Sequence, residues 1–275
     1  MNYLQTASKN TLIAIKKNKW KFVILILLQF LLLGALFGSG IIYQVKLFQD
    51  IQGISEPLQR ANFDEASLQD GQAFTTEMYT IFQSYQLLMK HLGEFAGILG
   101  LVFLILGGAI WILTNNLLDK DLEKNKPKKL FHSWLKYVVS SIVIFIPIAL
   151  AGYFLFKLLF SLGLSETALA NLIGGIMIAF IIGYYFLLVA FALIHNLSWK
   201  NFLKEFWKVS IKRIHFNLLL LLVNIIVLFL GGLLIYLTLS ETLFPLLLLA
   251  SILFLILIVL VRIFFVFGVQ EILKK

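Results

Sequence analysis

Six long apolar segments, separated by polar connections, dominate the pattern of the chain. Each is long enough for the roughly 20 apolar residues that a helix needs to cross a bilayer, and they cover residues 22–43, 96–117, 137–162, 168–195, 216–238 and 245–267. Their runs of Leu, Ile, Val and Phe lack the alternating polar positions of membrane β-strands. The pattern predicts an all-α fold, a polytopic membrane bundle of about six transmembrane helices that forms a single domain over residues 1–275.

The composition supports this class of protein. Hydrophobic residues make up 60% of the chain and charged residues 13%, and the mean hydropathy is +0.94, which lies outside the range of soluble globular domains. A cleaved signal peptide is the competing interpretation of the first apolar segment. We expect a permanent helix instead, because this segment is longer than the apolar core of a signal peptide and no good cleavage site follows it.

Basic residues are concentrated in four parts of the chain. They occur in residues 1–21, 118–136 and 196–215 and at Lys274 and Lys275, whereas the remaining connections hold only Lys46, Arg60 and Lys90. Because basic residues are retained on the cytoplasmic side of a membrane, this pattern predicts a multi-pass protein of the cell membrane with both termini in the cytoplasm. The same segregation explains an isoelectric point near 9.6, so no nucleic-acid partner is expected.

Residues 198–216, SWKNFLKEFWKVSIKRIHF, have the pattern of an amphipathic helix. Lysines recur at every fourth position, and aromatic and aliphatic residues occupy the opposite arc; the lysines are Lys200, Lys204, Lys208 and Lys212. Such a helix lies in the membrane interface with its lysines toward anionic lipid headgroups, and Ser198 is placed to cap it. Residues 1–21 form a shorter cytoplasmic segment of this type. A topological anchor with no further role is the alternative interpretation.

The connection over residues 44–95 is acidic and much longer than the others. Gly53, Pro57 and Gly71 interrupt it, and apolar residues then recur at helical spacing into the second apolar segment. We expect an external helical hairpin extension, packed by its own apolar face. His91 near Glu94 is too small a group for a metal site, which needs three or four ligands, so neither a metal nor another cofactor is predicted.

Six polar residues lie inside the predicted spans at a similar depth toward the cytoplasmic side: Gln29, Ser140, Ser141, Tyr184, Tyr185 and Asn224. Polar groups are costly in a membrane and often mark functional sites. These residues either line an inward-facing polar cavity or form hydrogen bonds that hold the helices together. Lys157 and Arg262 lie near the ends of their spans, where we expect their charges to reach the headgroups by snorkelling.

A basic elbow precedes the first long helix in the segment LIAIKKNKWKFVILILLQFLL, and hairpins follow it. This layout resembles the six-helix membrane families related to the membrane domain of glycerophosphoryl diester phosphodiesterases. The resemblance covers most of the chain, and the acidic segment 44–95 departs from it. It implies a helical membrane bundle without a known set of catalytic residues, so no site residue is assigned from it.

The sequence lacks the motifs of intramembrane enzymes. It has no acidic residue within a predicted span, no H-E-x-x-H pattern and no cysteine. We therefore expect a protein that is not an enzyme and that organises or binds lipid or partner proteins at the cytoplasmic membrane. A facilitator or transporter of a neutral or amphipathic small molecule is the alternative, because the six polar residues would suit such a molecule.

Overall fold

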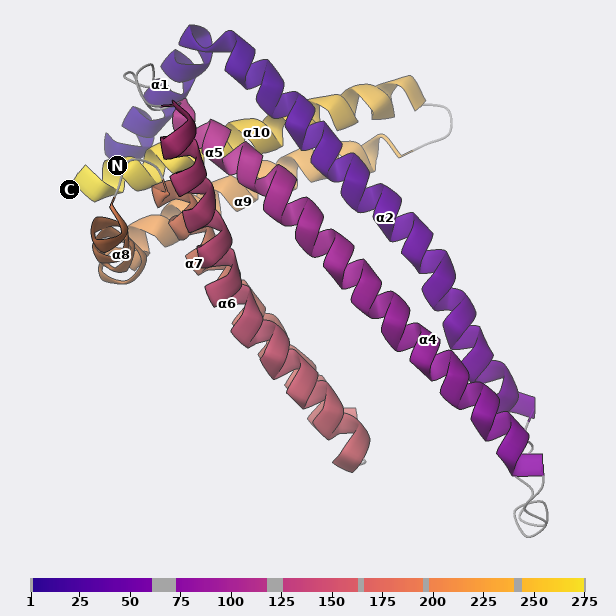
Figure 1. The fold of residues 1–275 in the computed structure, drawn as a ribbon. Coiled ribbons are helices and arrows are strands. Elements are labelled where there is room, and N and C mark those ends of the chain that lie inside the picture. Colours follow the sequence, from indigo (N-terminus) through magenta and orange to yellow (C-terminus); the bar gives the residue numbers. More distant parts are fainter. Residues whose placement is uncertain are drawn as a thin grey trace. The chain divides into compact units, whose positions relative to one another are not determined.

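The computed structural model describes residues 2–60, 73–117, 126–162, 166–194, 198–239 and 244–274, and these residues form helices and no strand (Figure 1). Six of the helical stretches are long and apolar enough to cross a membrane: Lys19–Pro57, Met78–Asn116, Leu130–Pro147, Gly174–Leu193, Ile214–Leu237 and Phe244–Lys274. The predicted all-α class and the six helices of membrane-spanning length are thereby confirmed. The tip of the predicted hairpin, residues 61–72, and the side chain of Lys157 lie outside the described part.

The described helices fall into two halves of the chain. The first half contains α1 (Asn2–Lys17), α2 (Lys19–Arg60), α4 (Ala73–Val102), the π-helical turn η1 (Phe103–Gly107) and α5 (Gly108–Asn116). The second half contains α6 (Lys126–Leu162), α7 (Glu166–Leu193), α8 (Trp199–Trp207), the π-helical turn η2 (Lys208–Lys212), α9 (Ile214–Leu237) and α10 (Phe244–Lys274). The contacts divide the chain into two compact units, unit 1 (residues 1–29 and 108–275) and unit 2 (residues 30–107).

In unit 1, α9 and α10 form a closely packed antiparallel pair. A Cβ atom at Gly231 would lie 2.6 Å from Cδ2 of Leu257, and one at Gly268 would lie 2.5 Å from Cδ2 of Leu220. Glycine allows this close approach of the two helices, because a larger residue at either position would force the neighbouring leucine side chain to shift. These two contacts fix the register of the helices, which brings Leu220 beside Gly268 and Gly231 beside Leu257.

The N-terminal helix α1 packs on the C-terminal part of α10, so the two chain ends lie side by side (Figure 1). Its buried residues, Tyr3, Ala7, Thr11 and Ala14, recur at helical spacing. The Tyr3 hydroxyl donates to the carbonyl oxygen of Phe216 at 3.2 Å, and burial raises the pKa of Tyr3, which keeps it a neutral donor. The buried face of the basic segment 1–21 is therefore covered by protein.

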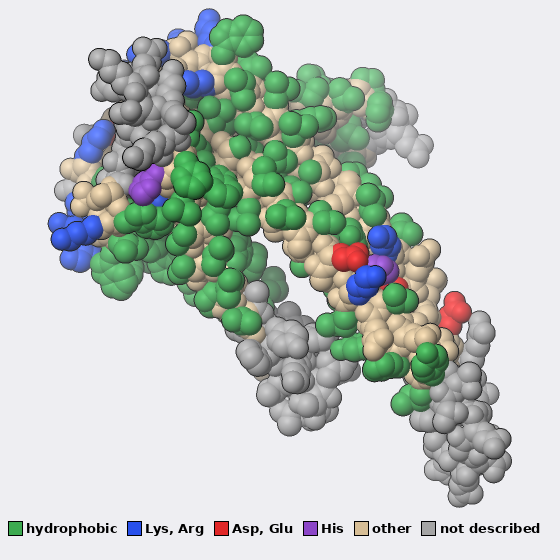
Figure 2. Space-filling view, viewed as in Figure 1, with side chains coloured by type: hydrophobic (Ala, Val, Ile, Leu, Met, Phe, Trp, Pro, Cys, Tyr) green, Lys and Arg blue, Asp and Glu red, His purple; other side chains and the backbone are tan. Residues whose placement is uncertain are grey.

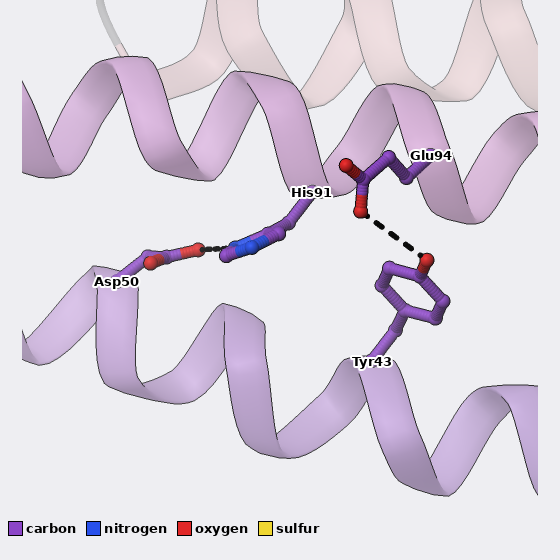
Figure 3. Close-up of polar contacts among 4 residues, drawn as sticks. All are labelled: Tyr43, Asp50, His91 and Glu94. Carbon is purple, nitrogen blue, oxygen red and sulfur yellow. Dashed lines mark hydrogen bonds and ion pairs between the residues drawn. The ribbon is translucent and has the colours of Figure 1, made fainter.

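Unit 2 joins the distal part of α2 to α4 through side chains (Figure 3). Nδ1 of His91 lies 2.6 Å from Oδ2 of Asp50, and the Tyr43 hydroxyl donates to Oε2 of Glu94 at 3.4 Å. The Tyr43 ring also packs on Phe95, with ring centroids 5.2 Å apart. These contacts pair the two helices as a hairpin requires, and its external position stays a prediction.

Candidate functional site

One end of unit 1 is rich in basic side chains and is called the basic end here. Figure 2 shows Lys and Arg gathered there, on the side where the chain termini lie in Figure 1. Several of these side chains donate to carbonyl oxygens at the ends of helices: Lys21 to Asn116 at 3.3 Å, Lys136 to Ile194 at 3.4 Å, Lys208 to Leu273 at 3.5 Å, and Arg213 to Ile272. The C-terminal carbonyls of a helix lack intrahelical donors and carry negative partial charge, so the basic side chains stabilise α5, α7 and α10.

The four regularly spaced lysines of residues 198–216, Lys200, Lys204, Lys208 and Lys212, are called the lysine stripe here. The helix that carries the first of them begins where the sequence predicts. The Ser198 side chain accepts from the backbone N–H of Asn201 at 3.3 Å, which confirms the predicted N-cap of α8. Phe202 and Val209, on the apolar face, are buried in the protein, and the rings of Phe206 and Phe186 lie 6.0 Å apart. Part of the apolar face is thus covered by protein, and Phe206 contacts α7.

The four lysines of the stripe differ in their surroundings. Lys200, Lys204 and Lys212 are exposed, whereas Lys208 is partly buried between Glu205, at 3.9 Å, and the end of α10. The π-helical turn η2 begins at Lys208, so the stripe does not continue along a single α-helix. Contact of the exposed lysines with anionic lipid stays a prediction.

The six polar residues predicted for a cavity are divided among different partners. Tyr185 donates to the carbonyl oxygen of Ser210, in η2, at 2.8 Å, and Ser141 donates to the carbonyl oxygen of Tyr137 in its own helix at 2.9 Å. Ser140 is buried, and Asn224 is buried with its Oδ1 unpartnered. The contact of Tyr185 is the interhelical hydrogen bond of the alternative interpretation, and a cavity stays a prediction.

The remaining two of the six, Gln29 and Tyr184, lie around Arg262 of α10. Nη2 of Arg262 donates to Oε1 of Gln29 at 2.5 Å, and its Cζ lies 5.6 Å from the centroid of the Trp111 ring, a cation–π distance. Tyr184 and Tyr137 lie within electrostatic range of the guanidinium. Side chains of α2 and α5 therefore contact one arginine, and tyrosines of α6 and α7 lie within its electrostatic range. We call this group the Arg262 centre.

The Nη1 atom of Arg262 is buried, although Tyr184 of the same centre is half exposed. Gln29 follows Lys21 by eight residues in α2, so it lies about 12 Å further along the helix axis. Nη1 of Arg262 is buried and has no hydrogen-bond partner. The expectation that this arginine snorkels to the headgroups does not describe its contacts, because the guanidinium is directed to Gln29 and Trp111.

The described part of unit 1 offers no acidic partner for Arg262. Glu205 lies 3.9 Å from Lys208, and Glu271 lies 2.5 Å from Lys274. Neither forms an ion pair with Arg262. An arginine at the centre of a membrane helix costs on the order of 3 kcal/mol in insertion experiments, and hydrogen bonding to Gln29 compensates only part of the charge.

Comparison with models of protein families, with curated proteins and with solved structures finds no match to this chain. Among the described residues, no group of three or more His, Cys, Asp or Glu side chains is placed to hold a metal ion. The basic end and the Arg262 centre are therefore the two candidate functional features of unit 1.

Proposed function

We propose that this chain is a non-catalytic multi-pass membrane protein that binds anionic lipid headgroups at its basic end, on the cytoplasmic side of the cell membrane. Such binding would organise lipid, or a membrane protein partner, around the bundle. The proposal gains its main support from segments in which exposed lysines alternate with exposed large apolar side chains. Lys200 and Lys204 alternate with exposed Leu203 and Trp207 in α8, and Trp20, 82% exposed, follows Lys19 in α2.

This alternation suits the boundary between headgroups and acyl chains. Apolar side chains gain free energy when they enter the acyl region, and neighbouring lysines then lie level with lipid phosphates. Each lysine near an anionic surface contributes about 1 kcal/mol at physiological salt. The three exposed lysines of the stripe would together favour anionic lipid by up to about 3 kcal/mol.

The composition of the lipid shell tests this function. The full chain is reconstituted into membranes with a fixed fraction of phosphatidylglycerol and is extracted with its shell by a polymer, and the lipids are quantified by mass spectrometry. We expect enrichment of phosphatidylglycerol over the bulk membrane, and we expect Lys200→Gln, Lys204→Gln and Lys212→Gln together to remove it. High salt should weaken the enrichment because the interaction is screened.

A matched control uses lysines of unit 2. Lys46→Gln and Lys90→Gln change the charge in the same direction but belong to unit 2, and they should leave the enrichment unchanged. Equal enrichment in the stripe variant and in the wild type would refute the proposal. We also propose the resemblance to the six-helix families related to phosphodiesterase membrane domains. Such a relationship would agree with a non-catalytic bundle.

A facilitator for a neutral or amphipathic molecule is the second candidate. It is favoured by Tyr184, which is 50% exposed on the surface of α7 and yet lies within range of the Arg262 centre. Substituting Gln29, Tyr185 and Asn224 together with apolar residues would separate the two functions. Loss of flux into vesicles with the fold intact would favour the facilitator. Unchanged lipid enrichment without any flux in the wild type would favour headgroup binding.

A further inference from the structure

We infer that the Arg262 centre is an internal binding site for one amphiphilic molecule with a singly charged oxyanion, either a carboxylate or a phosphodiester. This site is separate from the exposed lysines and does not depend on their role. The Nη1 atom of Arg262 is buried, and it is a charged donor without a hydrogen-bond partner. Buried charged donors are normally paired, so the geometry is incomplete without an acceptor.

The charge of the ligand follows from the charges around it. The guanidinium carries one positive charge, and its nearest hydrogen-bonding side chain, Gln29, is neutral. The two acidic side chains described in unit 1, Glu205 and Glu271, each lie beside a lysine. One negative charge would therefore balance the centre, whereas a doubly charged phosphate would leave an excess charge in a medium that disfavours it.

The donors at the centre also suit an oxyanion. Nη1 of Arg262 presents N–H groups in a planar fork, the geometry that carboxylate and phosphate oxygens accept. Tyr184 lies within electrostatic range of the same guanidinium. A tyrosine hydroxyl that donates to an oxyanion would add to the binding without adding charge.

The amphiphilic character of the ligand follows from the surface beside the centre. Tyr184 is half exposed, and the α7 residues in the turns before it, Ile178, Ile181 and Ile182, are exposed as well. In a membrane helix, such a surface faces acyl chains. A molecule with an apolar tail could therefore lie along α7 while its anionic group reaches Arg262 past the Tyr184 ring.

Two substitutions test the site, so that one variant can still decide if the other fails to fold. Arg262→Gln removes the cation. Gln29→Glu keeps the side-chain length and the acceptor position but supplies an internal carboxylate, so it neutralises Arg262 and should preserve the fold. Lys200→Gln, Lys204→Gln and Lys212→Gln together serve as the control, because these exposed residues lie away from the Arg262 centre.

Delipidated full-length protein in a non-ionic detergent is titrated with oleate, with phosphatidylglycerol and with diacylglycerol, and bound molecules are counted by native mass spectrometry. We expect one oleate or one phosphatidylglycerol per chain to bind saturably at high salt, where binding to the exposed lysines is screened, and no saturable binding of uncharged diacylglycerol. The anion that binds more tightly identifies the source of the oxyanion. Both Arg262→Gln and Gln29→Glu should weaken binding about tenfold or more, and the lysine variant should retain it.

The opposite results would overturn the inference. These are the absence of a saturable site for either anion, equal binding of diacylglycerol, or wild-type binding by folded Gln29→Glu protein. If Arg262→Gln fails to fold, the Gln29→Glu result decides. Loss of binding in the lysine variant alone would assign the anion to the basic end and would also reject the internal site.

Discussion

The imidazole of His91 and the carboxylate of Asp50 form a short cross-helix contact in unit 2, with 2.6 Å between Nδ1 and Oδ2. Asp50 is only 8% exposed, so its carboxylate depends on this partner more than a surface carboxylate would. The contact joins α2 to α4 beyond the first apolar segment. It is therefore a point at which the pairing of the two long helices can be tested.

We predict that His91→Leu loosens unit 2, because the buried Asp50 carboxylate would lose its partner at a cost on the order of 1–3 kcal/mol. Backbone hydrogen exchange of residues 44–56 and 84–95, measured in detergent micelles, should become several-fold faster. Lys90→Gln alters an exposed neighbour on the same helix and should leave exchange unchanged. Similar exchange rates in both variants would show that the contact contributes nothing to the pairing.

Gly231 and Gly232 provide a matched pair on α9. A Cβ at Gly231 would meet Leu257 and Phe254, whereas nothing lies within 4 Å of a Cβ at Gly232. Gly231→Leu should therefore lower the free energy of unfolding by about 1–3 kcal/mol, and Gly232→Leu should be neutral or slightly stabilising because glycine is a poor helix former. Unfolding in mixed micelles measures both, and an equal loss at the two positions would contradict the packing of α9 on α10.

The Tyr185 hydroxyl holds η2 by its hydrogen bond to the Ser210 carbonyl oxygen. Tyr185→Phe should lower the free energy of unfolding by about 0.6 kcal/mol, the average for an interhelical hydrogen bond in a membrane protein. Tyr236→Phe removes the same group from a side chain that is 70% exposed, and it should have no effect. If the two variants unfold alike, the Tyr185 contact is not a net source of stability.

The proposed orientation is open to cysteine labelling, because the chain has no native cysteine. Gln83→Cys in unit 2 and Asn201→Cys in α8 are exposed positions. The distribution of basic residues predicts that an impermeant thiol reagent labels Gln83→Cys in intact cells and labels Asn201→Cys only after permeabilisation. The reverse pattern would place the basic end outside the cell.

Hydrophobicity was sufficient to find the helices but not their full lengths. The apolar runs marked all six because each span must exclude water along its whole length. The first apolar run ends near residue 43, and the predicted hairpin extends the helix beyond it. The interruptions predicted at Gly53 and Pro57 are wrong, because α2 continues through both residues to Arg60. Local hydrophobicity reports the bilayer, whereas this extension is paired with α4 by contacts such as that between Asp50 and His91.

The contacts of Arg262 cannot be predicted from its own segment, because its partners lie on other helices. Gln29 was recognised as an unusual polar residue, but its partner lies 233 residues away in the sequence. The distance of Arg262 from the end of its own span predicts contact with the headgroups, but this distance takes no account of neighbouring helices. The register of lysines at every fourth position likewise predicted an uninterrupted α-helix and could not reveal η2.

The basic side chains that bind the helix-end carbonyl oxygens limit how the charges of this chain can be changed. Lys21, Lys136, Lys208 and Arg213 are among the charges that would steer insertion, and the same four side chains bind carbonyl oxygens once the bundle has formed. Under the predicted orientation, the same four side chains would serve both the insertion of the chain and the stability of the helix ends. A redesign that inverts the chain by deleting these charges would also leave three helix ends open, so an inverted molecule would need new caps before it could fold.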